Sequence, residues 1–234
     1  MSLNNRYKPE YKYFQKLREN IRSNKKILNF KKKKWSGLVK RLKLSKKYKF
    51  FNHDLYNISR RAKSFKNFYR SQLSTKQRLK LYYGKLTDTQ LKKLSRTATV
   101  TSKKKSIQQK PSEILLFSLE ARLETALYRS YFVSSINTAR QLIVYGNVLV
   151  NNKKVTNGNF LLKKGDLINI SENSHGKIKQ NILKSNFWPL PPVHLEINYK
   201  TLSIYFTENI EFIHLSSSYS FWLNLKSVLF FYKN

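Results

Sequence analysis

Cysteine is absent from the sequence, and acidic residues are scarce. Without cysteine the chain can form no disulfide bond, no cysteine-ligated zinc site and no thiol nucleophile. Its four histidines are scattered without the spacing of a metal site, so we expect no metal ion and no cofactor. No apolar run approaches the ~20 residues of a membrane-spanning helix, and the first residues lack the hydrophobic core of a signal peptide. We therefore expect no membrane span.

Positive charge dominates the composition, with 47 Lys and Arg against 12 Asp and Glu and a net charge of +35. Such a charge destabilises a compact chain by self-repulsion unless a polyanion neutralises it. Residues 1–110 hold 34 of the basic residues and 4 of the acidic ones. The composition therefore predicts a nucleic-acid partner. The abundance of Lys, Asn, Tyr, Phe and Ile, which A/T-rich codons encode, indicates a genome such as that of an organelle.

Residues 1–69 carry basic clusters interleaved with aromatic residues. Pure lysine tails stay solvated, whereas aromatic residues between the charges indicate a segment that orders against RNA. Some of the rings would then pack in the protein and others would stack on bases. A solvated extension is the alternative. The basic residues that we expect to contact RNA here are Lys31, Lys32, Lys33, Lys34, Arg60 and Arg61.

Residues 70–110 are expected to form a helical segment followed by a linker. Two stretches, beginning at Ser74 and Thr87, match the capping box, in which a hydroxyl and an amide satisfy free backbone donors. Gly84 lies between them and is expected to end the first helix. Residues 97–110 are polar, which favours a linker. The first helix contributes two more candidate RNA contacts, Lys76 and Arg78.

Residues 111–172 show the clearest periodicity in the chain. One helix is predicted to start at Ser112 and to carry a continuous apolar stripe. A second helix is predicted to start at Ser135 and to end at Gly146. Two short strands, NVLVN and DLINIS, follow with Asn-Asn and Lys-Gly turns. The expected order is helix, helix, strand, loop, strand.

Residues 173–234 are expected to be rich in β-structure and to pack on the body of the protein. The stretch HLEINYKTLSIYF alternates around a turn near Asn198–Lys200. The aromatic C-terminus, SFWLNLKSVLFFYKN, is predicted to form a final strand. The predicted fold class is therefore α+β. It comprises a basic, largely helical N-terminal region, a helix-helix-strand-strand RNA-binding module and a β-rich C-terminal tail.

The fixed residues of this module resemble the RNA-binding domain named after ribosomal protein four of the small subunit. The matching residues are Arg122, Leu123, Glu124, Leu127, Tyr128, Arg129, Ala139, Arg140, Gln141, Leu142, Ile143, Gly146, Val148, Val150, Asn151, Lys153, Gly165 and Asp166. Upstream, the pattern Q-L-x-x-K-Q followed by Y-G resembles the ribosomal protein itself. Downstream, W-P and H-L-E-I-N-Y-K-T-L resemble its mitochondrial forms. Tyr131 and Asn152 stand where the family usually has glycine.

The domain alone leaves the protein's function open, because it also occurs in pseudouridine synthases, tyrosyl-tRNA synthetases and a heat-shock RNA-binding protein. An RNA-modifying enzyme would add a catalytic domain of roughly 150 residues or more. The segment after the module is much shorter and shows no catalytic constellation, so we expect no enzyme. A free RNA-binding quality-control factor is the other alternative.

The resemblance implies a structural component of the small ribosomal subunit in its mitochondrial, organelle-encoded form, with a plastid location less favoured. It implies direct binding to a helix junction in the 5′ domain of small-subunit ribosomal RNA (rRNA). It also implies contact with ribosomal protein five and a position near the point where mRNA enters the subunit. Roles in subunit assembly and decoding accuracy would follow.

The resemblance implies that the exposed faces of the two helices and the strand turn form one basic surface. We expect Arg122, Arg129 and Arg140 to bind phosphates, because guanidinium groups match phosphate oxygens in bidentate geometry. No carboxylate lies three or four residues from any of them, which excludes an ion pair along the helix but leaves a tertiary partner open. The other expected contacts are Ser134, Ser135, Thr138, Gln141, Tyr145, Asn151, Lys153 and Lys154.

Overall fold

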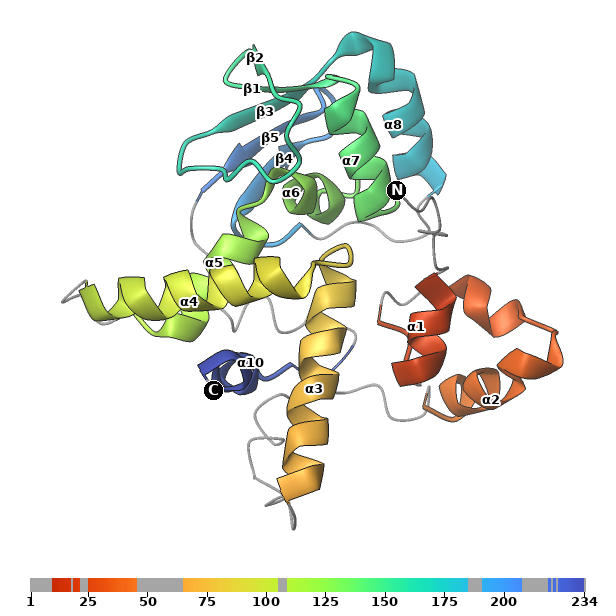
Figure 1. Ribbon diagram of the computed structural model, residues 1–234. Coiled ribbons are helices and arrows are strands. Elements are labelled where there is room, and N and C mark those ends of the chain that lie inside the picture. The colour runs from red at the N-terminus through yellow and green to blue at the C-terminus, as the bar shows by residue number, and fades with distance from the viewer. Residues whose placement is uncertain are drawn as a thin grey trace, which may run out of the picture. The chain divides into compact units, whose positions relative to one another are not determined.

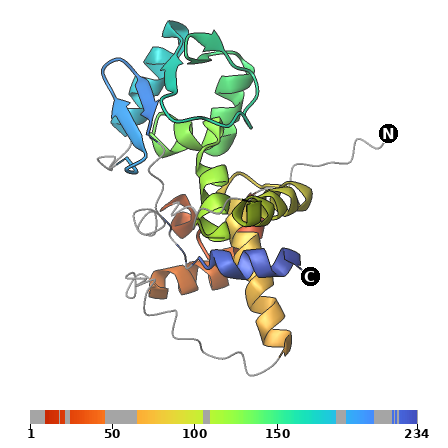
Figure 2. The ribbon, with the colours of Figure 1, turned by 90° about the vertical axis from the view of Figure 1, so that its left-hand side faces the viewer.

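The computed structural model of the chain describes residues 10–17, 19–21, 25–45, 65–104, 109–184, 191–207, 219, 221 and 223–233. The chain divides into two compact units, Met1–Thr87 with Tyr219–Asn234 and Asp88–Ser218. Figures 1 and 2 show the ribbon from two directions. The described elements are helices and one five-stranded sheet, which confirms the predicted α+β class.

The first unit is helical in its described residues. Its elements in chain order are α1 (Glu10–Leu17), the 3-10 helices η1 (Lys25–Asn29) and η2 (Lys33–Trp35), α2 (Ser36–Ser45), α3 (Phe65–Tyr82) and α10 (Leu225–Lys233). Helix α10 packs on α3, although the two come from distant parts of the sequence (Figures 1 and 2). The hydroxyls of Tyr83 and Tyr219 lie 2.6 Å apart and join the same two parts of the chain. The last residues therefore complete this unit.

The C-terminus forms the helix α10, so the prediction of a final strand is wrong. Leu225 and Val228 are buried one turn apart, which is helical spacing. The side chain of Asn224 accepts a hydrogen bond from the backbone N–H of Ser227 at 3.1 Å and caps the helix start. Aromatic composition favours a strand only through propensity, and packing on α3 outweighs it.

The second unit combines helices with the sheet. Its elements are α4 (Asp88–Lys104), α5 (Pro111–Glu120), α6 (Leu123–Arg129), α7 (Ile136–Val144), β1 (Val148–Val150), β2 (Lys153–Lys154), β3 (Leu167–Ile170), α8 (Glu172–Lys184), β4 (Leu195–Asn198) and β5 (Ser203–Phe206). The strand order is β2-β1-β3-β5-β4, with every pair antiparallel. Ile168 of β3 lies opposite Ile204 of β5. The predicted β4–β5 hairpin is thus confirmed, and it extends the sheet of the module.

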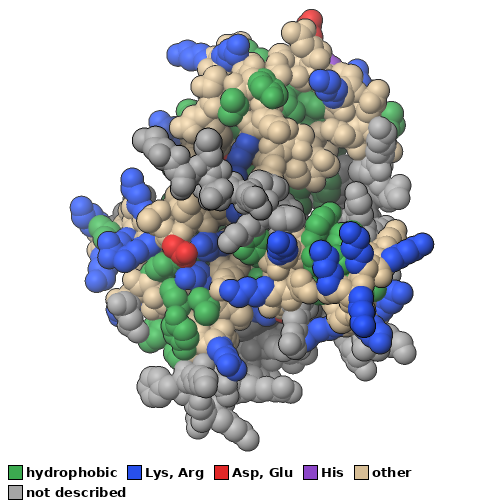
Figure 3. Space-filling view, turned by 45° about the vertical axis from the view of Figure 1, so that its right-hand side comes forward, with side chains coloured by type: hydrophobic (Ala, Val, Ile, Leu, Met, Phe, Trp, Pro, Cys, Tyr) green, Lys and Arg blue, Asp and Glu red, His purple; other side chains and the backbone are tan. Residues whose placement is uncertain are grey.

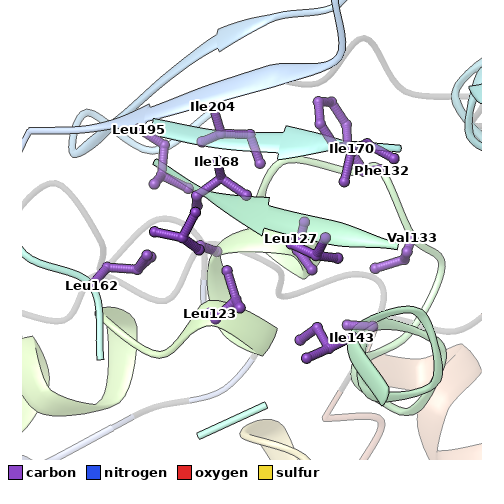
Figure 4. Packing of buried hydrophobic residues seen from close by; sticks show 14 of the residues in the cluster. Leu123, Leu127, Phe132, Val133, Ile143, Leu162, Ile168, Ile170, Leu195 and Ile204 are labelled. Atoms are coloured by element: carbon purple, nitrogen blue, oxygen red, sulfur yellow. The ribbon is translucent and has the colours of Figure 1, made fainter. Parts of the chain in front are cut away.

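The core of this unit lies between the sheet and the helices α6 and α7. Leu123 and Leu127 of α6 and Ile143 of α7 face Ile168 and Ile204 of the sheet (Figure 4). Each of these side chains is buried. Burial of such a side chain contributes about 1.5–3 kcal/mol, so this packing fixes how α7 sits on the sheet.

The helix predicted from Ser112 onward is broken into α5 and α6. Arg122 at the break has an extended backbone, with φ −74° and ψ 134°. The adjoining backbone groups are held by the loop before β3, because Leu123 N–H donates to the Phe160 carbonyl and Leu162 N–H donates to the Ala121 carbonyl. Arg122 and Arg129 therefore do not share one helical face, as a continuous helix would require.

Residues 97–104 belong to α4, so the predicted linker is wrong over this stretch. Leu91 and Ala98 are buried seven residues apart on one face of the helix. The hydroxyls of Thr97 and Thr99 donate to backbone carbonyls three residues earlier, at 2.9 and 2.8 Å. Polar side chains that suggest a loop are thus satisfied inside a helix.

Residues 172–184 form α8, where the sequence predicts the start of β-structure. Ile178 is buried, and Ile182, four residues later, packs against the same core. This spacing of two apolar residues is helical. The β-structure of the tail is therefore limited, among the described residues, to β4 and β5.

The local signals of the module are confirmed. The Ser135 hydroxyl accepts a hydrogen bond from the backbone N–H of Thr138 at 3.2 Å and caps α7. Gly146 ends α7 with a φ of 69°. Asn151 and Asn152 turn between β1 and β2 with φ values of 49° and 64°, which asparagine tolerates.

Two predicted N-cap residues, Ser74 and Ser112, are wrong. Ser74 lies inside α3 and donates to the Ser71 carbonyl at 2.9 Å. Helix α5 begins at Pro111, with Lys110 at the N-cap position and no side-chain cap. Proline suits the first helical position, because its missing N–H would have no partner there.

Candidate nucleic-acid interface

Four lysines that are predicted to bind RNA lie on the segment that contains η2, and all four are exposed. These residues are Lys31, Lys32, Lys33 and Lys34. The side-chain amide of Gln15 in α1 donates to the Lys34 carbonyl at 2.8 Å and ties this segment to the helix. The lysines thus stand on an anchored backbone. Arg60 and Arg61 lie outside the described residues.

Aromatic rings hold the same segment in place. The ring of Phe30 lies 4.9 Å from that of Tyr11 and 5.4 Å from that of Trp35, measured between centroids. Phe14 is buried beside Tyr11. These four rings pack on one another, so they belong to the aromatic residues that pack inside the protein and not to those available for stacking on bases.

Lys76 and Arg78 of α3 both make contacts within the first unit. Arg78 donates to the Glu19 carboxylate at 2.6 Å. The ammonium of Lys76 lies 4.2 Å from the centroid of the Phe231 ring, a cation–π distance. These contacts join α3 to an N-terminal residue and to α10. Direct RNA contact by Lys76 and Arg78 stays a prediction.

Arg129 is buried in an ion pair with Glu120. Its Nε and Nη2 donate to the two oxygens of the Glu120 carboxylate, at 3.1 and 2.5 Å. The Nε2 atom of buried His194 lies 3.9 Å from the same carboxylate. Burial lowers the pKa of His194 to about 4, with Glu120 opposing the shift and Arg129 adding to it. The charge of Arg129 is therefore already compensated inside the protein.

Arg122 and Arg140 share the buried carboxylate of Glu124. Arg122 Nη2 lies 2.7 Å from Glu124 Oε1, and Arg140 bonds both carboxylate oxygens. The side-chain oxygen of Asn159 also accepts from Arg122. Desolvation lowers the pKa of Arg122, Glu124 opposes that shift, and Arg140 adds to it.

The three arginines differ in their access to solvent. Arg122 and Arg129 are buried, whereas the side chain of Arg140 is 37% exposed. Each has the tertiary carboxylate partner that helical spacing left open. The structure thus gives Arg122 and Arg129 internal roles and leaves Arg140 at the surface. Phosphate contact by each of them stays a prediction.

The outward face of α7 is polar and accessible. Exposed side chains here are those of Ser134, Gln141 and Tyr145, and Tyr145 is 72% exposed. Gln141 and Tyr145 lie four residues apart, which is about one helical turn. Ser135 and Thr138 are half-buried, and their hydroxyls lie 2.8 Å from each other at the cap. The N-terminal end of a helix favours an anion, because its dipole and its N–H groups point toward the ligand.

The β1–β2 turn adds two lysines to the surface. Lys153 and Lys154 are exposed, whereas the side chain of Asn151 bonds Asp166 and the Leu167 N–H and so shapes the turn. The side chain of Lys154 passes over Gly146, where an added Cβ would lie 1.8 Å from its Cε. The lysine therefore lies next to the C-terminal end of α7.

Several residues of the interface region are missed by sequence reasoning. Glu120 and Glu124 pair with Arg129 and Arg140 across 9 and 16 residues, separations that no helical rule covers. Exposed basic residues also line α4, and they are Lys92, Lys93, Arg96, Lys103 and Lys104. Figure 3 shows Lys and Arg side chains spread over the visible face and few acidic ones. The sequence indicates the basic residues of α4 only through the high positive charge of residues 1–110 as a whole.

Two further findings concern the described residues alone. They contain no cluster of three or more His, Asp or Glu side chains that could hold a metal ion. None of their helices combines the length and apolarity needed to cross a membrane. The α7 face and the β1–β2 turn present cations, amides, hydroxyls and the exposed ring of Tyr145, which are groups that bind phosphates, sugars and bases.

Comparison with known families identifies the module. The model of the S4 domain matches residues 121–168, from the break before α6 into β3. Fold and surface together define a basic protein built around an S4 domain.

Comparison with individual proteins widens this match. The chain is 40% identical over 178 residues to small ribosomal subunit protein uS4m of Marchantia polymorpha, which covers 73% of this chain and 85% of that protein. It is 38% identical to uS4 of Pelagibacter ubique and 40% identical to uS4 of Aquifex aeolicus, over 49% and 52% of those proteins. The chain belongs to the uS4 family of small ribosomal subunit proteins. It spans about half the length of the bacterial relatives it matches.

Proposed function

We propose that this chain is a structural component of the small subunit of a mitochondrial ribosome and binds small-subunit rRNA directly. The observation that carries the proposal is the 40% identity over 85% of a mitochondrial uS4m protein. The net charge of +35 supports it, because a polyanionic partner would relieve the self-repulsion of the chain. A structural role in place of an enzymatic one follows from the family.

The direct RNA interface, in this proposal, combines the α7 face with the β1–β2 turn. Arg140, Lys153 and Lys154 would neutralise phosphates, and Gln141 and Tyr145 would contact sugars or bases. Other module residues have supporting roles. Those that shape or hold this surface are Arg122, Arg129, Ser135, Thr138 and Asn151. The lysines of the first unit would supply further phosphate contacts.

Finer partners follow from the family resemblance and belong to the same proposal. The RNA target would be a helix junction in the 5′ domain of the rRNA. The protein would contact ribosomal protein five near the point where mRNA enters the subunit, and would thereby support decoding accuracy. An organelle gene fits the A/T-rich codon bias of the composition.

Density-gradient sedimentation of organelle lysate tests the proposal. The chain should sediment with the small subunit and its rRNA, and should remain there at moderate salt. A chain found only free or on tRNA would contradict it. An assay of purified protein for uridine isomerisation tests the enzymatic alternative, and we expect no product.

A further inference from the structure

Four aromatic residues of α3 and α10 form one partly exposed surface on the first unit. Tyr69 is 55% exposed, Phe68 43% and Phe230 45%, and Phe231 is half-buried. The rings pair across the two helices, Phe68 with Phe230 at 5.9 Å and Tyr69 with Phe231 at 5.8 Å between centroids. Helix α10 lies against α3 in both ribbon views (Figures 1 and 2). We name these four residues the aromatic platform.

The platform contrasts with the other aromatic cluster of the first unit. Around Phe30 the rings cover one another and Phe14 is fully buried. In the platform the cross-helix pairs use only part of each ring, so a large aromatic area faces solvent. Exposed apolar surface of this kind, gathered at one place, marks a binding site.

The surroundings of the platform are basic. Neither α3 nor α10 contains an Asp or a Glu. Arg70, Lys226 and Lys233 are exposed on these helices, and the Lys76 ammonium lies 4.2 Å from the Phe231 ring. Glu19 contacts Arg78 of α3, which is about 13 Å along the helix from Tyr69 at 1.5 Å per residue.

We propose that the aromatic platform binds unpaired nucleotides of the small-subunit rRNA by stacking on their bases. Aromatic faces beside cations are the combination that binds single-stranded RNA, because the rings take bases and the cations take phosphates. Bases within a duplex are already stacked on one another, so the site requires a loop or a bulge. The inference rests on the proposed function and names a second kind of RNA contact, outside the S4 domain.

A protein partner is the other occupant that an aromatic surface suggests. The interior of a protein–protein interface is depleted in lysine, whereas here Lys76 lies over the platform itself. The charge around the platform therefore favours RNA. A binding assay with only the purified chain and RNA separates the two occupants, because it contains no partner protein.

Binding of the full chain to a transcript of the small-subunit rRNA is measured for wild type, Tyr69→Trp and Tyr69→Leu. We expect Tyr69→Trp to keep the affinity and Tyr69→Leu to weaken it about tenfold, the scale of one lost base stack. The slope of log affinity against log salt should not change, because stacking releases no counterion. Arg70→Ala, by contrast, removes a cation and should lower this slope.

Leu183→Ala serves as the matched control, since this side chain is 84% exposed on α8 in the other unit and its loss should leave binding unchanged. Circular dichroism and urea unfolding confirm that each variant is folded. Equal affinity of Tyr69→Leu and wild type would overturn the inference. If that variant binds rRNA normally but fails to enter the subunit, the platform binds protein, and the inference is equally overturned.

Photocrosslinking gives an independent reading. Transcripts carrying 4-thiouridine are irradiated with the full chain, and trypsin then releases the platform in two peptides, 67–70 and 227–233. Crosslinked uridine on both peptides is the expected result, and its absence from both contradicts the inference. Failure of wild type to bind the rRNA at all would instead remove the proposed function.

Discussion

Tyr131 follows the end of α6 with a φ of 61°, in the left-handed region of the backbone. Glycine is the usual residue at such a helix end, and the resemblance predicts glycine here. A side chain in this conformation costs about 1–2 kcal/mol, because its Cβ crowds the following carbonyl. The residue that departs from the family is therefore also a strained one.

Replacing Tyr131 by glycine should stabilise the protein. We expect the free energy of unfolding to rise by about 1 kcal/mol in urea denaturation, since the strain outweighs the added backbone entropy of glycine. Tyr131→Ala keeps the Cβ and should show no such gain. An equal gain for both variants would mean that the ring, and not the backbone, is unfavourable.

Glu120 compensates a charge that cannot reach solvent. Glu120→Gln should lower the free energy of unfolding by about 3–5 kcal/mol, because it leaves Arg129 buried without a carboxylate. The exposed Glu196 of β4 provides the control, and Glu196→Gln should change stability by less than about 0.5 kcal/mol. Similar small effects of both substitutions would show that Arg129 finds solvent or another partner.

His194 should make the RNA-free protein sensitive to mild acid. Its pKa is about 4 in the folded chain against 6.5 when exposed, so between these values the unfolded chain binds a proton that the folded chain does not. Stability is therefore full above pH 6.5 and falls as the pH drops toward 4, by up to roughly 3 kcal/mol. Denaturant titrations across this range should show a flatter dependence for His194→Gln. An unchanged dependence would assign the loss to other groups.

At the scale of elements, local signals predict local structure well. The Ser135 cap, the Gly146 stop and the Asn151–Asn152 turn all follow from side-chain chemistry within a few residues. The break before Arg122 does not, because the loop before β3 causes it through hydrogen bonds from distant residues. Local signals do not predict helix α10 for a similar reason, since its packing partner α3 lies more than 140 residues earlier in the sequence.

Two glycines in the same unit offer a paired test, one at the end of α7 and one inside α8. Gly146→Ala should lower the free energy of unfolding by about 1–2 kcal/mol, because φ is 69° and the new Cβ would collide with Lys154. Gly176→Ala, inside α8 with nothing within 4 Å, should raise it by about 0.5–1 kcal/mol. Chemical denaturation checks both, and a loss of stability at each position would contradict the assignment of α8 as an open helix face.

For the whole molecule, the sequence predicts which partner is bound better than it predicts which residues contact that partner. The charge and the motif spacing identify an RNA-binding module, because both are properties of the chain itself. Burial is a property of the fold, so the sequence does not distinguish the buried Arg122 and Arg129 from the more exposed Arg140. We propose a division of roles, in which the basic residues of 1–110 supply most of the affinity and the module supplies orientation.

In the proposed function, the α7 face and the β1–β2 turn bind rRNA phosphates. The salt dependence of rRNA binding is measured for the triple variant Arg140→Ala/Lys153→Ala/Lys154→Ala. In this variant the buried Glu124 keeps Arg122 as its ion-pair partner. A triple variant of other exposed lysines, Lys177, Lys179 and Lys200, removes the same charge as a control. We predict that the slope of log affinity against log salt falls by about 2 in the first variant, at ~0.7–0.9 per phosphate contact, and stays near wild type in the control. An unchanged slope in the first variant, or an equal fall in both, would show that this surface does not bind the phosphates.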